Sequence, residues 1–168
     1  MTQKSSFRLP VAAFSILLLL LLGVFVLIQL LPIGKDQTNP PVIAEPNWDS
    51  PQTRQTFMQA CGDCHSNETV WPWYSKIAPV SWLISRDVNE GRRKLNVSEW
   101  GVRENEADEA VKLVQNGEMP PWFYLPLHPQ ARLNSAQKQT FLNGLAATFG
   151  SENEINSQKI ESEENDND

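Results

Sequence analysis

The chain has 168 residues and a formal net charge of −6 at pH 7. The whole of this charge lies in residues 151–168, so residues 1–150 are neutral overall. Nothing in this distribution indicates a nucleic-acid partner, because such partners attract a basic excess. The length allows one folded domain with accessory segments.

Residues 1–10 are polar and carry Lys4 and Arg8, and residues 11–31 follow without any charged side chain. A helix over the second stretch would be about 31 Å long, which is enough to cross the hydrocarbon core of a bilayer. A cleaved signal peptide is the alternative, but its apolar region covers only about 7–15 residues and precedes a small-residue cleavage site. Residues 31–35 offer no such site, so we expect an uncleaved transmembrane anchor.

The orientation of this anchor follows from the positive charges beside it. Lys4, Arg8 and the terminal amine precede the span, whereas only Lys35 follows it closely. Because positive charges stay on the cytoplasmic side, we expect residues 1–10 in the cytoplasm and residues 32–168 across the membrane. The prediction is a single-pass protein of a bacterial inner membrane with its domain in the periplasm.

The rest of the chain divides by composition into three parts. Residues 32–47 are rich in proline and polar side chains, which is typical of an extended, semi-rigid linker. We expect the folded domain over residues 48–150. Residues 151–168 are polar and acidic, and we expect them to form a disordered tail.

The stretch Cys61-Gly62-Asp63-Cys64-His65 contains both cysteines of the chain and one of its two histidines. This pattern is the attachment motif of a c-type haem. Two thiols three residues apart on a helical turn can reach the two vinyl groups of the porphyrin, and the histidine after them can bind the iron. The motif predicts one haem c, attached through Cys61 and Cys64, with His65 as an iron ligand.

Three other interpretations of the two cysteines fit the chain less well. A thioredoxin-like redox pair needs a βαβ setting, and no strand pattern precedes Cys61. A structural zinc site needs four ligands, and His128 is the one further Cys or His residue. A disulfide between Cys61 and Cys64 would leave the adjacent His65 unexplained.

The run Trp71-Pro72-Trp73-Tyr74 is too aromatic for an ordinary exposed loop. Haem is large, flat and apolar, so aromatic rings are a natural wall for it. We therefore predict that Trp71, Trp73 and Tyr74 contact the cofactor. Packing of these rings in the protein core is the alternative.

Helical periodicity and capping residues predict four helices in the domain. The second of them ends in a basic run, Arg92-Arg93-Lys94, which could pair with a haem propionate, dock a redox partner or form a solvated helix end. The expected starts are Ser50-Pro51, Pro79, Asn105 and Asn134, and the third helix is expected to end at Asn116-Gly117.

Met119 follows the third predicted helix in a proline-rich loop and is the one methionine after the haem motif. A thioether there is well placed to be the second axial ligand, which is the arrangement of electron-transfer cytochromes c. A methionine that fills a gap in the core is the alternative. His128 is the competing ligand, and it could also be a loop histidine bonded to a backbone carbonyl.

Several of these motifs together resemble the bacterial haem-binding domain family, whose members carry a single Cys-x-x-Cys-His motif. The resemblance covers about residues 25–148 and implies an exported or membrane-tethered c-type haem domain. It rests on Asn39-Pro40-Pro41-Val42, the stretch from Cys61 to Thr69, Trp71-Pro72-Trp73-Tyr74, Ala78-Pro79-Val80-Ser81-Trp82, Gly91-Arg92-Arg93, Asn96-Val97-Ser98-Glu99-Trp100 and Gly117-Glu118-Met119-Pro120-Pro121-Trp122.

The layout is also similar to that of class I cytochromes c. Their N-terminal helix ends in the haem motif, a Met-Pro loop comes late in the chain, and the C-terminal helix packs on the first. Carried over to this chain, the resemblance implies that Cys61 and Cys64 form the thioethers. It also implies that His65 is the proximal ligand and Met119 the distal one.

We therefore expect an all-α protein, with an N-terminal transmembrane helix and a small cytochrome c-like haem domain. The predicted function is a membrane-anchored monohaem cytochrome that relays single electrons on the periplasmic side, a carrier rather than an enzyme. Its redox partner proteins are not identified by the sequence. The alternatives are a peroxidase-like haem enzyme or a gas or redox sensor with an open sixth iron position, and a haem subunit of a larger membrane complex.

Overall fold

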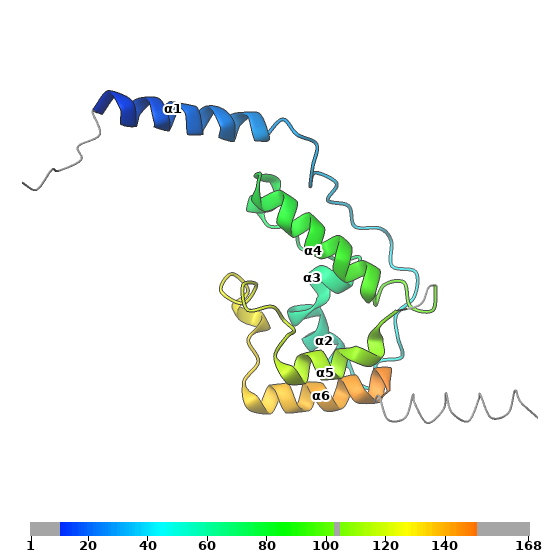
Figure 1. Cartoon of the computed structure of the whole chain (residues 1–168). Helices are drawn as coiled ribbons and strands as arrows, with labels where there is room; N and C mark the ends of the chain where they lie inside the picture. Colours follow the sequence, from blue (N-terminus) through cyan, green and yellow to red (C-terminus); the bar gives the residue numbers. More distant parts are fainter. Residues whose placement is uncertain (1–10, 103–104, 151–168) are drawn as a thin grey trace, which may run out of the picture. The chain divides into compact units, whose positions relative to one another are not determined.

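The computed structural model describes residues 11–102 and 105–150, and its regular structure in these ranges is helical (Figure 1). The described residues contain no strand, only an isolated bridge between Ala44 and Glu99. The all-α prediction is therefore confirmed for this part of the chain. The predicted cytoplasmic N-terminus and acidic tail lie outside the described residues.

The chain forms two compact units, which are described separately here. The first unit comprises Met1–Gln37 and Pro72–Ser85, and the second comprises Thr38–Trp71 and Arg86–Asp168. The helix α4 (Val80–Lys94) begins in the first unit and continues in the second.

The first unit contains α1 (Val11–Ile28) and the short 3-10 helix η1 (Trp73–Lys76). The side chains of α1 are almost all apolar, and most of them are exposed. The helix ends at a turn in which the Gln29 side chain bonds the backbone of Ala78 twice: its Nε2 donates to the carbonyl and its Oε1 accepts from the N–H. These bonds connect the end of α1 to the loop before α4.

The prediction of a transmembrane anchor over residues 11–31 is wrong. Among the helices of the described residues, none is both long enough and apolar enough to cross a membrane. The 18 residues of α1 extend about 27 Å, less than the roughly 30 Å of a hydrocarbon core, because residues 29–31 form a turn. The predicted inner-membrane location depends on this anchor and is corrected with it.

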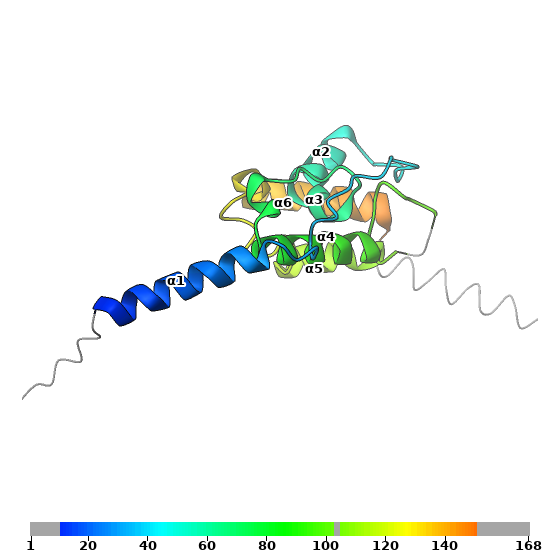
Figure 2. The ribbon, with the colours of Figure 1, turned by 90° about the horizontal axis from the view of Figure 1, so that it is seen from above.

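The second unit is built around α2, α5 and α6, of which α2 and α5 both pack against α6 (Figures 1 and 2). Its helices besides the end of α4 are α2 (Pro51–Ala60), α3 (Gly62–His65), η2 (Ala107–Glu109), α5 (Ala110–Asn116), η3 (Pro129–Ala131) and α6 (Ser135–Phe149).

The ends of these helices follow local sequence signals. The Ser50 side chain accepts a hydrogen bond from the N–H of Thr53 at the start of α2, and Asn134 forms a capping box with Gln137 at the start of α6. Gly117 ends α5 in the left-handed conformation, at φ 76°. The predicted caps at these three positions are confirmed.

An aromatic core holds the second unit together. Trp48 contacts Phe57 and Phe149 at ring-centroid distances of 5.2 and 5.8 Å, and Trp100 stacks on Phe149 at 5.3 Å. Phe57 lies on α2, four residues before the first motif cysteine, so the core supports that helix directly. The buried core residues are Phe57, Leu95, Val97, Ala107, Val114, Phe141, Leu145 and Phe149.

The segment predicted as a linker is extended, and its later part is bonded to the second unit. The N–H of Ile43 donates to the carbonyl of Ser98 at 2.8 Å, and the N–H of Trp100 donates to the carbonyl of Ala44 at 3.0 Å. The second unit accordingly begins at Thr38, ten residues before the predicted domain start.

Candidate functional site

The haem motif lies where α2 ends and α3 begins. Cys61 follows the last residue of α2, and its carbonyl accepts hydrogen bonds from the N–H groups of Cys64 at 3.1 Å and His65 at 2.9 Å. Both cysteines are free thiols. A short helical turn therefore carries both thiols and the histidine, which is the local structure that the motif predicts.

The imidazole of His65 is oriented by a backbone carbonyl. Its Nδ1 lies 3.0 Å from the carbonyl oxygen of Leu95. Because a carbonyl can only accept, the proton is on Nδ1 and the lone pair is on Nε2. Burial lowers the pKa of His65, although the bond to Leu95 opposes this shift. The ring is therefore held neutral, with Nε2 available to a metal ion.

Burial also determines the state of the two thiols. It raises the pKa of Cys61 to about 12, and the pKa of Cys64 to about 12, with a further contribution to the latter from the negative charge of Asp63. Both side chains are consequently protonated at neutral pH. Protonated thiols are the groups that add to vinyl double bonds when thioethers form, so the donor set of the motif fits a c-type haem.

A buried polar network joins the backbone that follows His65 to residues 96–98. The side chain of Asn96 donates to the Asn67 side chain at 2.9 Å, and the Ser98 hydroxyl accepts from the N–H of Asn67 at 2.9 Å. The N–H of Val97 donates to the carbonyl of His65 at 2.9 Å. These bonds fix the chain that supplies the Leu95 carbonyl. Asn67, Asn96 and Ser98 were not predicted as site residues. The one sign of them in the sequence is that all three are uncharged polar residues within the motifs that carry the family resemblance.

The helix α4 passes very close to the motif at Gly91. A Cβ atom on this residue would lie 2.5 Å from the carbonyl oxygen of Cys64 and 2.9 Å from its Cβ. Only glycine allows this approach without a shift of the backbone. Gly91 is thus part of the site, although it carries no side chain that could react.

Arg92 connects three stretches of the second unit. Its guanidinium donates to the carbonyls of Ser66 at 2.8 Å and Thr38 at 2.9 Å, to Asn39 Oδ1 at 3.1 Å and to Thr69 Oγ1 at 2.8 Å. One interpretation of the basic run Arg92-Arg93-Lys94 was a solvated helix end. These hydrogen bonds show that Arg92 does not fit that interpretation.

The two other basic residues of the run form surface ion pairs. Arg93 lies 3.7 Å from Glu90, and Lys94 lies 2.7 Å from Glu106. Both pairs are substantially exposed, so each is expected to contribute little to stability.

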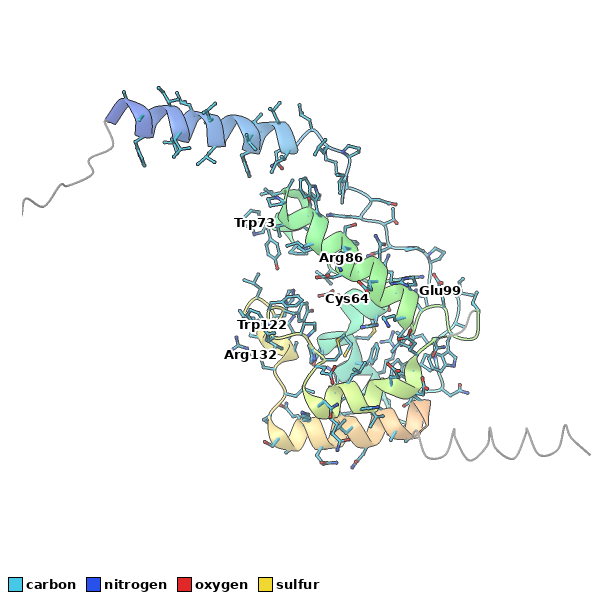
Figure 3. All side chains as sticks on the ribbon, in the orientation of Figure 1. Cys64, Trp73, Arg86, Glu99, Trp122 and Arg132 are labelled. Atoms are coloured by element: carbon cyan, nitrogen blue, oxygen red, sulfur yellow. The ribbon has the colours of Figure 1, made fainter. Side chains whose placement is uncertain are left out.

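Met119 follows α5 and packs, partly buried, against the same core cluster as Cys61. Its N–H donates to the carbonyl of Leu113 at 3.2 Å, which fixes the start of the loop. The loop continues through Trp122, whose side chain is 81% exposed (Figure 3). Large exposed aromatic side chains are unusual on a surface and mark an available apolar contact.

Three side chains connect this loop with the motif. The Tyr124 hydroxyl donates to Asp63 Oδ2 at 2.7 Å, and the ring of His128 stacks on Tyr124 with centroids 3.6 Å apart. His128 Nδ1 donates to the carbonyl of Tyr124 at 2.9 Å, while Nε2 lies 3.9 Å from Asp63 Oδ2. Of these three residues, only His128 was predicted as a site residue, because Asp63 and Tyr124 match no ligand pattern.

The predicted aromatic wall is divided between the two units. In the second unit, Trp71 donates its indole N–H to Asn39 Oδ1 at 3.0 Å. Trp73 and Tyr74 belong to the first unit, where their rings meet edge to face at 5.7 Å. Contact of these three side chains with a haem stays a prediction.

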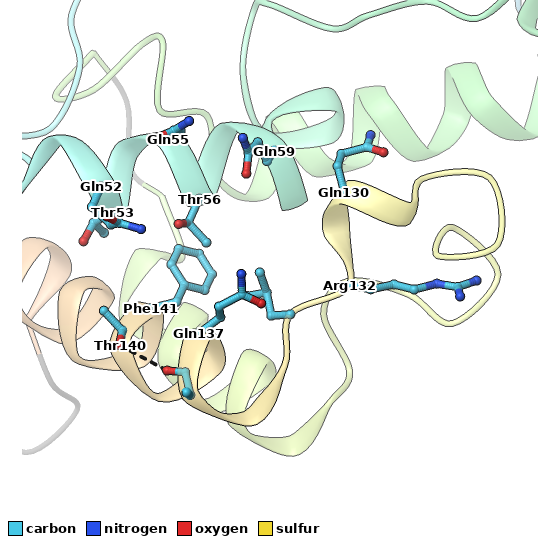
Figure 4. A pocket seen from close by; sticks show the side chains of 12 residues that line it. Gln52, Thr53, Gln55, Thr56, Gln59, Gln130, Arg132, Gln137, Thr140 and Phe141 are labelled. Carbon is cyan, nitrogen blue, oxygen red and sulfur yellow. Dashed lines mark hydrogen bonds between the residues drawn. The ribbon is translucent and has the colours of Figure 1, made fainter.

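A groove of about 330 Å³ lies between α2 and the start of α6 (Figure 4). Glutamine and threonine side chains from both helices line it, together with Arg132 from the preceding loop. No cysteine or histidine lies in its wall, so it is separate from the haem motif. Within the described ranges, no three Cys, His, Asp or Glu side chains form a metal-binding group, which leaves the zinc interpretation without support.

Comparison with known protein families identifies a haem-binding domain. A family model described as haem-binding domain matches residues 23–147, a range that contains the motif, Met119 and almost all of α6. No curated protein and no solved structure matches the chain.

Proposed function

Because the chain belongs to the haem-binding domain family, we propose that it is a monohaem c-type cytochrome that relays single electrons. The observation that carries the proposal is the bond from His65 Nδ1 to the Leu95 carbonyl at 3.0 Å. It leaves the lone pair on Nε2, on the same helical turn that carries the two protonated thiols. In this proposal Cys61 and Cys64 hold the haem covalently and His65 is the proximal ligand.

The haem supplies one-electron redox chemistry when it is bound. The chain then has to hold the iron, exclude water from it and tune its potential through the second axial ligand. Met119 is favoured for that position because its loop is bonded to the motif through the Tyr124 hydroxyl and Asp63. His128 is disfavoured because its Nε2 faces the Asp63 carboxylate at 3.9 Å.

The absorption spectrum of the purified protein in both redox states tests this proposal. We expect haem that stays on the chain after denaturation, a six-coordinate spectrum, and a ferrous form that binds carbon monoxide only slowly. Loss of retained haem in a Cys61→Ser, Cys64→Ser double variant would verify the attachment. A wild-type protein that never acquires haem would overturn the proposal.

The alternative is a haem enzyme or sensor with an open sixth iron position. The observation that favours it is the group of Asp63, Tyr124 and His128 beside the motif, because such polar side chains could donate hydrogen bonds or protons to a bound ligand. Rapid carbon monoxide binding by the native ferrous protein would favour this alternative.

The sixth ligand itself is tested by Met119→Ala. If Met119 binds the iron, we expect the variant to have a lower reduction potential and to bind carbon monoxide, because a thioether ligand raises the potential and blocks the site. An unchanged spectrum would move the assignment to His128 or another group. His128→Ala, measured in parallel, separates these two outcomes.

A further inference from the structure

The loop that carries Met119 is bonded to the haem motif itself. Asp63 directly precedes Cys64 in the motif, and its two carboxylate oxygens accept hydrogen bonds from different partners. Oδ2 accepts from the Tyr124 hydroxyl at 2.7 Å, whereas Oδ1 accepts from the N–H of Val70 at 2.8 Å. One carboxylate thus joins the motif turn to the segment after it and to the loop after α5.

The Tyr124 side chain is held in place by more than its hydroxyl. The ring of His128 lies parallel to it, with an interplanar angle of 5° and a centroid distance of 3.6 Å. The bond from His128 Nδ1 to the Tyr124 carbonyl fixes the histidine against the same residue. The phenol is therefore presented to Asp63 in one orientation, and its bond to a carboxylate is of the stronger, charge-assisted kind.

We infer that Tyr124 is a positioning residue that holds the Met119 loop against the haem motif through its bond to Asp63. This inference rests on the proposed function, since it concerns the same haem site. Tyr124 itself does not bind the iron. Its role is to keep the Met119 loop closed, so that the methionine remains at the sixth coordination position instead of leaving it open.

The backbone of the loop has attachments of its own on either side of Tyr124. The N–H of Met119 donates to the carbonyl of Leu113, and Arg132 Nε donates to the carbonyl of Leu125 at 3.1 Å. Loss of the Tyr124 bond should accordingly leave these backbone bonds in place and release the loop from Asp63, so that the Met119 side chain is no longer held against the motif.

The test compares haem-loaded wild type with Tyr124→Phe, which removes one hydroxyl and keeps the ring that His128 contacts. We expect the variant to retain its covalent haem and its fold but to bind carbon monoxide about tenfold faster in the ferrous form, with a lower reduction potential. A purely structural role would lower the thermal midpoint and leave these two iron readouts unchanged.

A double-mutant cycle with Asp63→Ala identifies the bond as the cause. If the hydroxyl acts through Asp63, the double variant should bind carbon monoxide no faster than Asp63→Ala alone. Additive effects would contradict the inference. Asp63→Asn is the second variant if Asp63→Ala does not fold. It keeps the shape and leaves only a neutral, weaker bond to the Tyr124 hydroxyl, so Tyr124→Phe should have a smaller effect in that background than in wild type.

Thr140→Val is the matched control, since it also removes one hydroxyl, whose bond to the Ala136 carbonyl at 3.1 Å lies within α6. We expect no change in carbon monoxide binding.

An unchanged rate and potential in Tyr124→Phe would overturn the inference while the proposed function stands. A wild-type ferrous protein that already binds carbon monoxide rapidly would overturn the inference but not the covalent attachment. Absence of haem would overturn both.

Discussion

At the scale of single residues, the site depends on atoms that are not side-chain functional groups. The carbonyl of Leu95 orients His65, and any residue at position 95 would supply the same oxygen. Gly91 contributes by having no side chain, so that α4 can approach Cys64. Sequence patterns identify ligands such as His65 by residue type, but they do not identify these supporting positions.

Gly91→Ala should destabilise the protein although alanine is the better helix former. Its new Cβ would lie 2.5 Å from the backbone oxygen of Cys64, an atom that cannot move without displacing the motif. We expect a loss of about 1–3 kcal/mol in the free energy of unfolding, which exceeds the helix-propensity gain of about 1 kcal/mol. Urea-induced unfolding, followed by circular dichroism, measures the change.

Gly23→Ala is the control for this prediction. Gly23 also lies inside a helix, α1, but a Cβ there would meet no atom within 4 Å. We expect this variant to be as stable as wild type or slightly more stable. Equal effects of the two substitutions would contradict the close approach of α4 to Cys64.

At the scale of elements, an ion pair joins the proline-rich segment to α2. Glu45 accepts from Arg54 through both carboxylate oxygens, at 2.6 and 2.7 Å, and also from the indole N–H of Trp48 at 2.8 Å. The hydrogen bond from Arg54 lowers the pKa of Glu45, with burial opposing it. The extended proline-rich segment is thus held to the helix that leads to the motif.

This pair should make the stability of the protein depend on acid pH. Because the folded-state pKa of Glu45 lies below its ordinary value of 4.5, its stabilisation is complete above that pH and is lost as the pH falls toward the folded-state pKa. Glu45→Gln should cost about 1 kcal/mol or less at pH 7, since both side chains are partly exposed. Thermal unfolding of both proteins from pH 7 to pH 3 measures the difference.

The difference between wild type and Glu45→Gln should shrink as the pH falls below 4.5. Arg54→Met supplies the comparison, because the double variant should lose no more than either single variant if the two side chains act as a pair. A difference that stays constant down to pH 3 would mean that the carboxylate charge of Glu45 does not contribute to folding.

At the scale of the whole molecule, Arg92 links parts of the second unit that are far apart in the sequence. Its four hydrogen bonds reach Thr38 and Asn39 before α2 and Ser66 and Thr69 after α3. A lysine has one ammonium group and cannot reproduce the planar fork of donors. The substitution would leave several of these acceptors without their partner.

Arg92→Lys should therefore lower the free energy of unfolding by about 2 kcal/mol, measured by urea denaturation. The adjacent Arg93 is the natural control, because its guanidinium lies 3.7 Å from Glu90 and its side chain is 70% exposed. Arg93→Lys should change stability by about 0.5 kcal/mol or less. Similar effects of the two substitutions would contradict the linking role of Arg92.

The N-terminal segment shows how composition alone can mislead. Residues 11–31 are uniformly uncharged, and their length predicted a membrane span. The helix instead ends at Ile28, where residues 29–31 form a turn before Pro32. The side-chain amide of Gln29 bonds Ala78, 49 residues away. No pattern within residues 11–31 identifies that partner.

The sequence by itself determined the features that depend on near neighbours. The caps at Ser50, Asn134 and Gly117 involve bonds across only a few residues, so residue type and order are sufficient to predict them. The Cys-x-x-Cys-His motif is equally local. It identified the haem-binding character that the family match supports.

Only the tertiary structure decided how the motif is supported. The Leu95 carbonyl lies 30 residues from His65, and the Tyr124 hydroxyl lies 61 residues from Asp63. A backbone carbonyl, a glycine or a phenol looks the same in sequence whether or not it has such a partner. The physical reason is that these contacts depend on distance in space, which residue type and order along the chain do not specify.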